Sequence, residues 1–293
     1  VDTATRRHGD TATRSVAHMQ LRQAYERDGY IFPLKVMTTV RAAEHRAMFE
    51  SVEAAYAEDA VASRIVKGFA NSVLPFVDEI MRLPSLLGPV KAILGEDLLV
   101  MGANFFIKEP ETPTFVSWHQ DLTYWGYDGA SEVTAWVALT AATPDQGCMR
   151  FIPGSHQREI VGHSDTFDES NMLSRGQEIS LKVNEVAAVD AVLEPGDMSL
   201  HHGHLFHASN PNSSAHRRIG LAIRYVTPSM KQVSGQTTFA HLVAGEDRFG
   251  HFQHLQPAAE VMADGDVENA RHMIALQEQI GYAGAADRGK RIT

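Results

Sequence analysis

A histidine and an aspartate separated by one residue lie near the middle of the chain, in the segment Trp118-His119-Gln120-Asp121. Side chains two positions apart on a β-strand share one face, so His119 and Asp121 could both reach one metal ion. The pair is weak evidence alone, because this spacing also arises by chance. A second histidine would complete a triad of two histidines and one carboxylate, which leaves positions open on iron(II) for an oxygenase reaction.

A histidine-rich stretch further along the chain supplies candidates for the third ligand. His207 is one, and His202 and His204 are its rivals. In an extended strand these two rivals point to the face opposite to His207, whereas His201 shares its face. The pattern alone leaves the choice open.

Arg218 follows His207 by 11 residues, after a turn over residues 210–214 that would fold the next strand back beside the histidine. The guanidinium fork of arginine binds a carboxylate through two hydrogen bonds. Metal chelation at one end and Arg218 at the other match the length and charge of 2-oxoglutarate. We expect Arg217 to point away from this site, whereas Arg224 shares the parity of Arg218 but lies three residue pairs further along.

The elements that must position these residues are short strands separated by polar turns. Residues 133–140 alternate most clearly, with Val133 and Val137 on one face and Thr134 and Trp136 on the other. This pattern predicts a double-sheet jelly roll. The expected strands are 98–101, 104–108, 133–140, 147–153, 186–193, 198–202 and 219–227.

Helices are expected on both sides of this core, around a strand at 30–36. Apolar residues recur at helical spacing over 15–28, and residues 38–59 and 257–281 also favour helix. Two short helices are expected within 70–94, interrupted near Pro84 and Pro89. We therefore predict one domain over 1–293, with a helical segment at about 15–95, a core at about 98–228 and a tail with a helix at about 229–293.

Composition excludes several classes of function. No run approaches the roughly 20 apolar residues of a membrane span. The net charge of −10 and the scattered basic residues argue against nucleic-acid binding. Cys148 is the only cysteine and the first 14 residues are polar, so we expect a reducing, cytoplasmic location. The expected partner is a small molecule, and the oligomeric state stays open.

Taken together, the chain resembles the phytanoyl-CoA dioxygenase family of iron(II)- and 2-oxoglutarate-dependent oxygenases, over about 105–226. The resemblance implies a mainly β fold with helical decoration around a double-stranded β-helix, a jelly-roll or cupin-like core. The matching pieces are Ile107-Lys108-Glu109-Pro110, the segment 118–124, Trp136, the segment 147–156, Pro195-Gly196-Asp197 and the segment 207–218.

The resemblance also implies roles for individual residues. The family pattern places the third iron ligand immediately before Ala208 and Ser209, which favours His207 over its rivals. The implied iron(II) ligands are then His119, Asp121 and His207. The implied contacts to 2-oxoglutarate are Arg218, Ser209, Lys108, Gln120 and Trp136.

The implied reaction is hydroxylation of an unactivated C–H bond of a small organic molecule, using O2 and 2-oxoglutarate and releasing succinate and CO2. Desaturation or cyclisation needs no other ligands and remains an alternative. A non-redox metal enzyme and a non-catalytic binder are alternatives of another class, against which Arg218 and the triad weigh. The carboxylate of Asp121 argues against halogenation, because halogenating relatives carry a small residue there.

The substrate is not fixed by the sequence. Residues 160–180 contain a second His-x-Asp pair, His163 and Asp165, which we interpret as part of a polar lid. Their charges suit a polar substrate at least as well as an acyl chain. Tyr124, Trp125 and Tyr127 follow the first ligands directly, and either line the pocket or serve the core.

Overall fold

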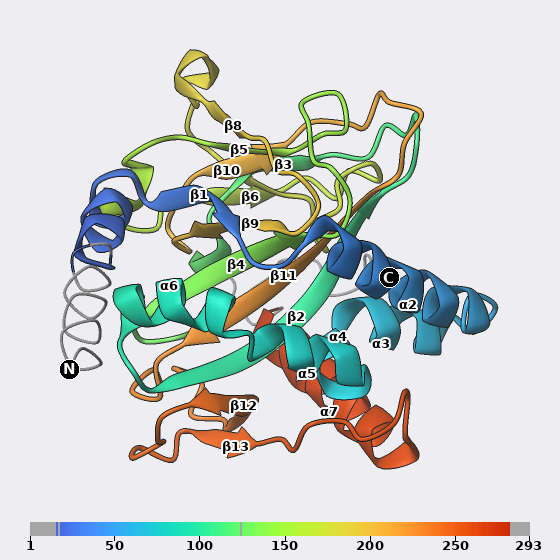
Figure 1. The fold of residues 1–293 in the computed structure, drawn as a ribbon. Coiled ribbons are helices and arrows are strands. Elements are labelled where there is room, and N and C mark those ends of the chain that lie inside the picture. The colour runs from blue at the N-terminus through green and yellow to red at the C-terminus, as the bar shows by residue number, and fades with distance from the viewer. Residues whose placement is uncertain (1–15, 17, 124, 282–293) are drawn as a thin grey trace, which may run out of the picture.

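The computed structural model describes residues 16, 18–123 and 125–281. Two sheets form its centre, one of seven strands and one of four, and a two-stranded sheet lies beside them. Figure 1 shows the two larger sheets stacked as layers, with the most N-terminal strand and the most C-terminal strands at opposite edges of the larger sheet. All pairings are antiparallel except that of the last two strands. The expected jelly-roll core is confirmed.

The larger sheet has the order β1-β9-β4-β11-β2-β12-β13 and the smaller one β3-β10-β5-β8. The strands of the larger sheet are β1 (Tyr30–Lys35), β9 (Asp197–His201), β4 (Glu132–Ala138), β11 (Arg218–Val226), β2 (Leu98–Lys108), β12 (Thr238–Ala244) and β13 (Phe252–His254). The remaining strands are β3 (Val116–His119), β10 (His207–Ser209), β5 (Met149–Phe151) and β8 (Val189–Ala191), with β6 (His163–Asp165) and β7 (Gln177–Ile179) in the third sheet.

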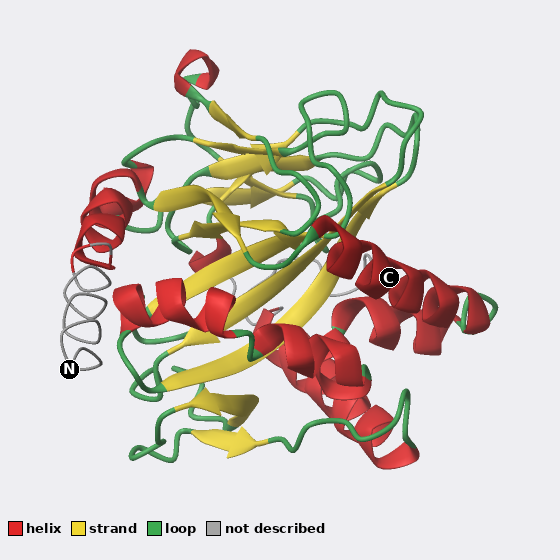
Figure 2. Ribbon diagram, in the orientation of Figure 1, coloured by secondary structure: helices red, strands yellow, loops and turns green. Residues whose placement is uncertain are grey.

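Helices pack against one face of the larger sheet (Figures 1 and 2). Residues 18–28 are helical as expected. Val133 and Val137 of β4 join the apolar core under the helices, whereas Trp136 belongs to a separate cluster on the opposite face. The predicted alternation of this strand is therefore confirmed. The named helices are α2 (Thr39–Ala55), α3 (Ala60–Gly68), α4 (Ala70–Val73), α5 (Pro75–Met81), α6 (Pro84–Leu94) and α7 (Asp264–Gly281).

Several boundaries differ from the sequence expectation for identifiable reasons. The predicted break at Pro89 is wrong: this proline lies inside α6, where the buried Leu86 and Val90 hold the helix on the core. Pro84 begins that helix, where a missing N–H removes no helical hydrogen bond. Residues 98–108 form one strand rather than two, because β2 continues through a register shift opposite Arg224 and Tyr225.

Other elements were not anticipated. The helix expected over 38–59 ends at Ala55, and Asp59 then caps α3 by accepting hydrogen bonds from two backbone N–H groups. β12 and β13 lie in the expected tail, and α7 begins later than predicted, at Asp264. No helix within the described ranges is long and apolar enough to cross a membrane.

Candidate active site

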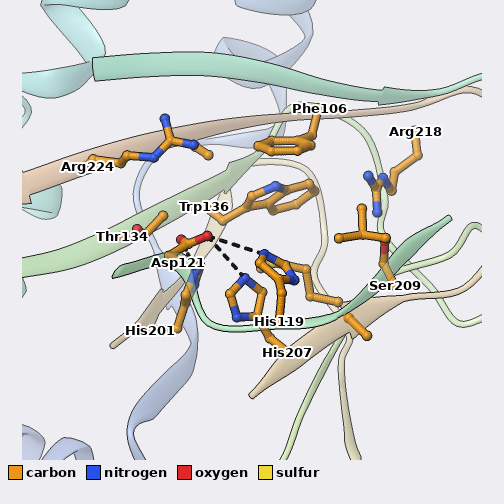
Figure 3. A pocket seen from close by; sticks show the side chains of 14 residues that line it. Phe106, His119, Asp121, Thr134, Trp136, His201, His207, Ser209, Arg218 and Arg224 are labelled. Atoms are coloured by element: carbon orange, nitrogen blue, oxygen red, sulfur yellow. Dashed lines mark ion pairs between the residues drawn. The ribbon is translucent and has the colours of Figure 1, made fainter. Parts of the chain in front are cut away.

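A cavity lies between the two larger sheets and encloses about 460 Å³ of empty space, part of it open to solvent. Figure 3 shows the side chains that surround it. The lining residues are Phe106, Val116, His119, Asp121, Thr134, Trp136, Met149, His201, His207, Ala208, Ser209, Arg218, Ala222 and Arg224.

His119 and His207 come from neighbouring strands of the smaller sheet and lie directly opposite each other in the pairing of β3 with β10. Their ring centroids are 4.0 Å apart. Each Nδ1 lies 2.9 Å from a carbonyl oxygen two residues earlier in the chain, that of Ser117 or Leu205. Because a carbonyl only accepts, each Nδ1 carries the proton and each Nε2 keeps a free lone pair. This is the tautomer that a metal-binding histidine needs.

Asp121 completes the group from a different kind of element. β3 ends at His119, and Asp121 begins the 3₁₀ turn Asp121–Thr123, so the prediction that both ligands lie on one strand is wrong. Its Oδ1 nevertheless lies 3.3 Å from His119 Nε2 and 3.8 Å from His207 Nε2. Adjacent ligands on one ion at about 2.1 Å lie roughly 3 Å apart, so the three side chains fit a metal.

The electrostatics of the three side chains favour a bound cation. Burial alone would raise the pKa of the Asp121 carboxyl, but the neighbouring imidazoles of His119 and His201 outweigh it and hold that pKa well below its usual range. Burial, and then the proximity of His119, lowers the pKa of His207. A carboxylate therefore faces a neutral imidazole. Within the described residues, this is the one group of three such side chains that could hold a metal ion.

His201 on β9 also approaches the centre, with Nε2 3.8 Å from Asp121 Oδ2 and its ring 4.8 Å from that of His207. In the sequence, its even separation from His207 indicated that the two histidines share one face. His202 and His204 lie in the turn after β9, outside the cavity lining. His202 Nδ1 accepts a hydrogen bond from the backbone N–H of His204, so this ring serves the turn.

One end of the cavity is formed by Arg218, the first residue of β11. Its side chain is 1% exposed, and its guanidinium lies 5.3 Å from the ring centre of Trp136. Nη1 donates to the backbone carbonyl of Gly147, and Nε has no partner among the described residues. Ser209 on β10 lines the same end. Arg217, as predicted, faces away and pairs with Glu50, Glu53 and Glu109.

Lys108 lies behind this end rather than in the cavity lining. It is directly opposite Arg218 in the pairing of β2 with β11. Its Nζ lies 2.7 Å from Ser209 Oγ and 3.2 Å from the Ser209 carbonyl oxygen, and it also donates to the carbonyl of Asn210. Burial, and then the charge of Arg218, lower the pKa of Lys108 to about 6.

Gln120 is the one expected co-substrate contact whose side chain turns away from the cavity. Nε2 donates to the carbonyl of His204 at 2.9 Å, and Oε1 accepts from the backbone N–H of Val161 at 2.9 Å. Consecutive residues of an extended chain point in opposite directions, so Gln120 cannot follow His119 inward. It ties the ligand-bearing segment to the neighbouring loop and to the turn after β9, which corrects the sequence expectation.

The second His-x-Asp pair lies in the β6–β7 hairpin, outside the cavity lining. His163 Nε2 accepts a hydrogen bond from the backbone N–H of Gln120 at 3.2 Å, and Asp165 pairs with Arg175 at 3.5 Å. Tyr127 stacks on Phe252 and is also absent from the lining, so it serves the core. Tyr124 lies outside the described residues.

The opposite end of the cavity carries a residue that the sequence argument set aside. Arg224, six positions after Arg218 on β11, lines the cavity beside Thr134 (Figure 3). Its guanidinium lies 5.3 Å from the ring centre of Trp125, which itself is absent from the lining. The shared parity of Arg218 and Arg224 was the available signal.

Comparisons with known proteins identify the family of this chain. A family model for phytanoyl-CoA dioxygenase matches residues 25–220. The chain is 26% identical over 168 residues to a probable alpha-ketoglutarate-dependent hypophosphite dioxygenase of Stutzerimonas stutzeri, covering 56% of this chain and 58% of that protein. It is 28% identical over 163 residues to the L-proline trans-4-hydroxylase of Streptomyces griseoviridis, covering 50% and 61%. The chain thus matches little more than half of the length of these relatives.

Solved structures extend the likeness over most of the chain. The apo form of the non-heme monooxygenase ThoJ superposes with a TM-score of 0.79 at 30% identity, covering 88% of this chain and 96% of that one. Its nickel complex superposes at 0.74 with 28% identity. Fold and site define an iron(II)- and 2-oxoglutarate-dependent oxygenase. The chain belongs to the phytanoyl-CoA dioxygenase family.

Proposed function

We propose that this protein is a dioxygenase that hydroxylates an unactivated C–H bond of a small polar molecule and converts 2-oxoglutarate and O2 to succinate and CO2. The observation that carries the proposal is the pairing of two sites in one cavity. Two histidines and a carboxylate converge within 4.8 Å, and at the end of the same cavity lies a buried arginine that has no carboxylate partner among the described residues.

Each residue has a role that its surroundings support. His119, Asp121 and His207 would hold iron(II), which supplies the oxidising chemistry when it binds O2 and the 2-oxo acid. Arg218 would take the distal carboxylate of 2-oxoglutarate, and Ser209 would add a hydroxyl donor. Trp136 would form the wall under Arg218. Lys108 would act through Ser209, which it touches, rather than on the co-substrate directly.

Two of the relatives are named for small, polar substrates, whereas others are named for phytanoyl-CoA. Of the first two, one is named for hypophosphite and the other for L-proline, both of which are compact and charged. Desaturation or cyclisation would use the same ligands and is distinguished only by the product.

The classes without oxidation fit the cavity less well. A non-redox metal enzyme or a simple binder has no need of a buried guanidinium beyond the triad. Burying that charge without a partner is costly, so a ligand anion is the natural compensation for Arg218.

The test is the consumption of 2-oxoglutarate by the purified, iron(II)-loaded chain with a panel of small amino acids, carboxylates and phosphorus oxyanions. We expect succinate release that rises with at least one panel compound and depends on iron(II) and O2. Mass spectrometry should then find that compound 16 mass units heavier for hydroxylation, or two units lighter for desaturation or cyclisation. Product formation that needs neither O2 nor 2-oxoglutarate would reject the proposal in favour of a non-redox enzyme.

A further inference from the structure

Three polar side chains form a row across the cavity wall beside the triad. Arg224 on β11 lies directly opposite Thr134 on β4, and Thr134 lies directly opposite His201 on β9. Side chains paired in this way on one face of a sheet have Cβ atoms about 5 Å apart. All three line the cavity. They therefore present their polar atoms to the same volume.

Each member of the row has a polar atom that no described residue satisfies. These atoms are Nε of Arg224, Oγ1 of Thr134 and Nδ1 of His201. Thr134 and His201 are each 2% exposed, so water does not reach them freely. Buried polar groups are almost always hydrogen-bonded in native proteins. Three adjacent exceptions on residues that line one cavity are consistent with a ligand that supplies the missing partners.

Arg224 also has no direct ion-pair partner within the described residues, although the carboxylates of Asp121 and Glu132 lie near enough to favour its charged form. No carboxylate oxygen in the described part of the chain lies within 4.0 Å of its guanidinium nitrogens. Glu132 lies two residues before Thr134 on β4. One of its carboxylate oxygens accepts a hydrogen bond from the backbone N–H of Gly203. The described contacts of Arg224 are a hydrogen bond to the amide oxygen of Asn104 and the ring of Trp125. By contrast, Arg217 on the outer face pairs with three glutamates.

The row lies at the other end of the cavity from Arg218. Six residues of β11 separate the two arginines, which corresponds to about 20 Å between their Cα atoms. Figure 3 shows Trp136 and the triad between their side chains. A single 2-oxoglutarate that chelates the metal and reaches Arg218 cannot also occupy Arg224. The second guanidinium is therefore left for a different anion.

We infer that Arg224, Thr134 and His201 form the substrate-anchoring site, which binds a compact oxyanion of the substrate, a carboxylate or a phosphate-type group. This inference rests on the proposed function, because it assigns the Arg218 end to 2-oxoglutarate. His201 Nε2 lies 3.8 Å from Asp121 Oδ2, so the row adjoins the triad. A substrate anchored there presents the carbons next to its anionic group to the metal centre.

The test measures binding without turnover. The chain is loaded with Mn(II), which broadens the proton signals of any small molecule bound near it, and one equivalent of 2-oxoglutarate fills the Arg218 end. The probes are butyrate, methyl phosphate and the neutral butyramide. We expect both anions, or one of the two if the site selects between carboxylate and phosphate, to be relaxed by the protein and butyramide not to be.

Variants of Arg224 and Thr134 test whether these residues bind the anionic probe. Arg224→Gln should weaken binding of the anionic probe at least tenfold, Arg224→Lys should weaken it less, and Thr134→Val should weaken it severalfold. Arg248→Gln removes the same charge from the exposed surface, 66% exposed, and should change nothing. Retained 2-oxoglutarate binding in the Arg224 variants shows that they remain folded.

The outcomes separate the two claims. Equal relaxation of butyrate and butyramide, or anion binding unaffected by Arg224→Gln, overturns the anchoring site while leaving the proposed function intact. Loss of 2-oxoglutarate binding in Arg224→Gln but not in Arg218→Gln would show that the co-substrate occupies this end, which also overturns it. Absence of 2-oxoglutarate binding in the unmodified, Mn(II)-loaded chain would reject the proposed function itself.

Discussion

His207 lies directly across from His119 in the antiparallel pairing of β10 with β3, although 88 positions separate them in the sequence. Both rings are held by a hydrogen bond from Nδ1 to a backbone carbonyl, so their Nε2 atoms converge on Asp121 without rearrangement. The strand pairing therefore fixes the orientations of three side chains that could hold a metal ion. Such preorganisation lowers the entropic cost of binding.

We predict that removing one ligand abolishes tight metal binding. His207→Ala should lose most of the iron that the unmodified chain retains after dialysis, because two ligands cannot replace a facial triad. Metal analysis by mass spectrometry measures the occupancy. The matched control is His202→Ala, which removes a histidine from the same stretch but outside the cavity. Full occupancy in His207→Ala together with loss in His202→Ala would reassign the ligand.

We predict that Arg218→Ala weakens 2-oxoglutarate binding about tenfold or more. The lost charge-assisted hydrogen bonds are typically worth about 1.5–3 kcal/mol. Calorimetric titration of the Zn(II)-loaded protein measures the dissociation constant without turnover. Arg217→Ala is the control, because Arg217 is the next residue before Arg218 but pairs with glutamates on the outer face. An unchanged dissociation constant in Arg218→Ala would remove this residue from the co-substrate site.

Gly220 offers a test of the wall under Arg218. A Cβ at this position would overlap the indole of Trp136, so Gly220→Ala must displace that ring or the strand. We expect a loss of about 1–3 kcal/mol in the free energy of unfolding and a weaker affinity for 2-oxoglutarate. Gly88→Ala in α6 is the control, because nothing lies within 4 Å of its added methyl group, and it should be neutral or slightly stabilising. Equal stability of the two variants would show that Trp136 is loosely held.

We predict that the buried His202 makes the folded state less stable at acidic pH. Burial, and then the nearby His204, lower the pKa of His202 to about 3, and its Nδ1 must stay unprotonated to accept the hydrogen bond from His204. Unfolded histidine binds its proton near pH 6.5. Between pH 6.5 and about 3 the unfolded state therefore binds more protons, and stability falls as the pH decreases, by up to about 1.4 kcal/mol per pH unit.

Denaturant unfolding of His202→Gln at several pH values measures this contribution. The variant should lose less stability than the unmodified chain between pH 6.5 and 5, by about 2 kcal/mol at most. His272→Gln, at an exposed position on α7, should keep the slope of the unmodified chain. Identical slopes for all three proteins would mean that His202 titrates normally in the folded state.

The sequence identified residues that the structure brings together better than it predicted their local geometry. The spacing of His119 and Asp121 and the position of Arg218 after His207 are local patterns, and the structure brings all four residues to one cavity. The expectation that Asp121 lies on the same strand as His119 was wrong, because Asp121 lies in a 3₁₀ turn. Two residues with one residue between them are too few to show where a strand ends.

Features that depend on pairing between distant strands could not be predicted. The sequence shows that Arg224 shares a strand face with Arg218. Its approach to the cavity, however, depends on the register of β11 with β4 and on the nearby register shift. Gln120 shows the reverse case: it matches the family pattern, yet its amide binds the neighbouring loop. β12 and β13 were both missed, and β13 is a three-residue edge strand, which carries little periodic signal.

The central claim is that iron(II) and 2-oxoglutarate bind together in this cavity. Its most direct test is an anaerobic titration of the iron(II)-loaded chain with 2-oxoglutarate, followed by the visible absorption of the iron(II)–2-oxo acid chelate. We predict an absorption band that saturates at one equivalent per chain, requires much higher 2-oxoglutarate in Arg218→Ala, and is absent in His207→Ala. No band in the unmodified protein with iron fully bound, or the same band in all three proteins, would contradict the account.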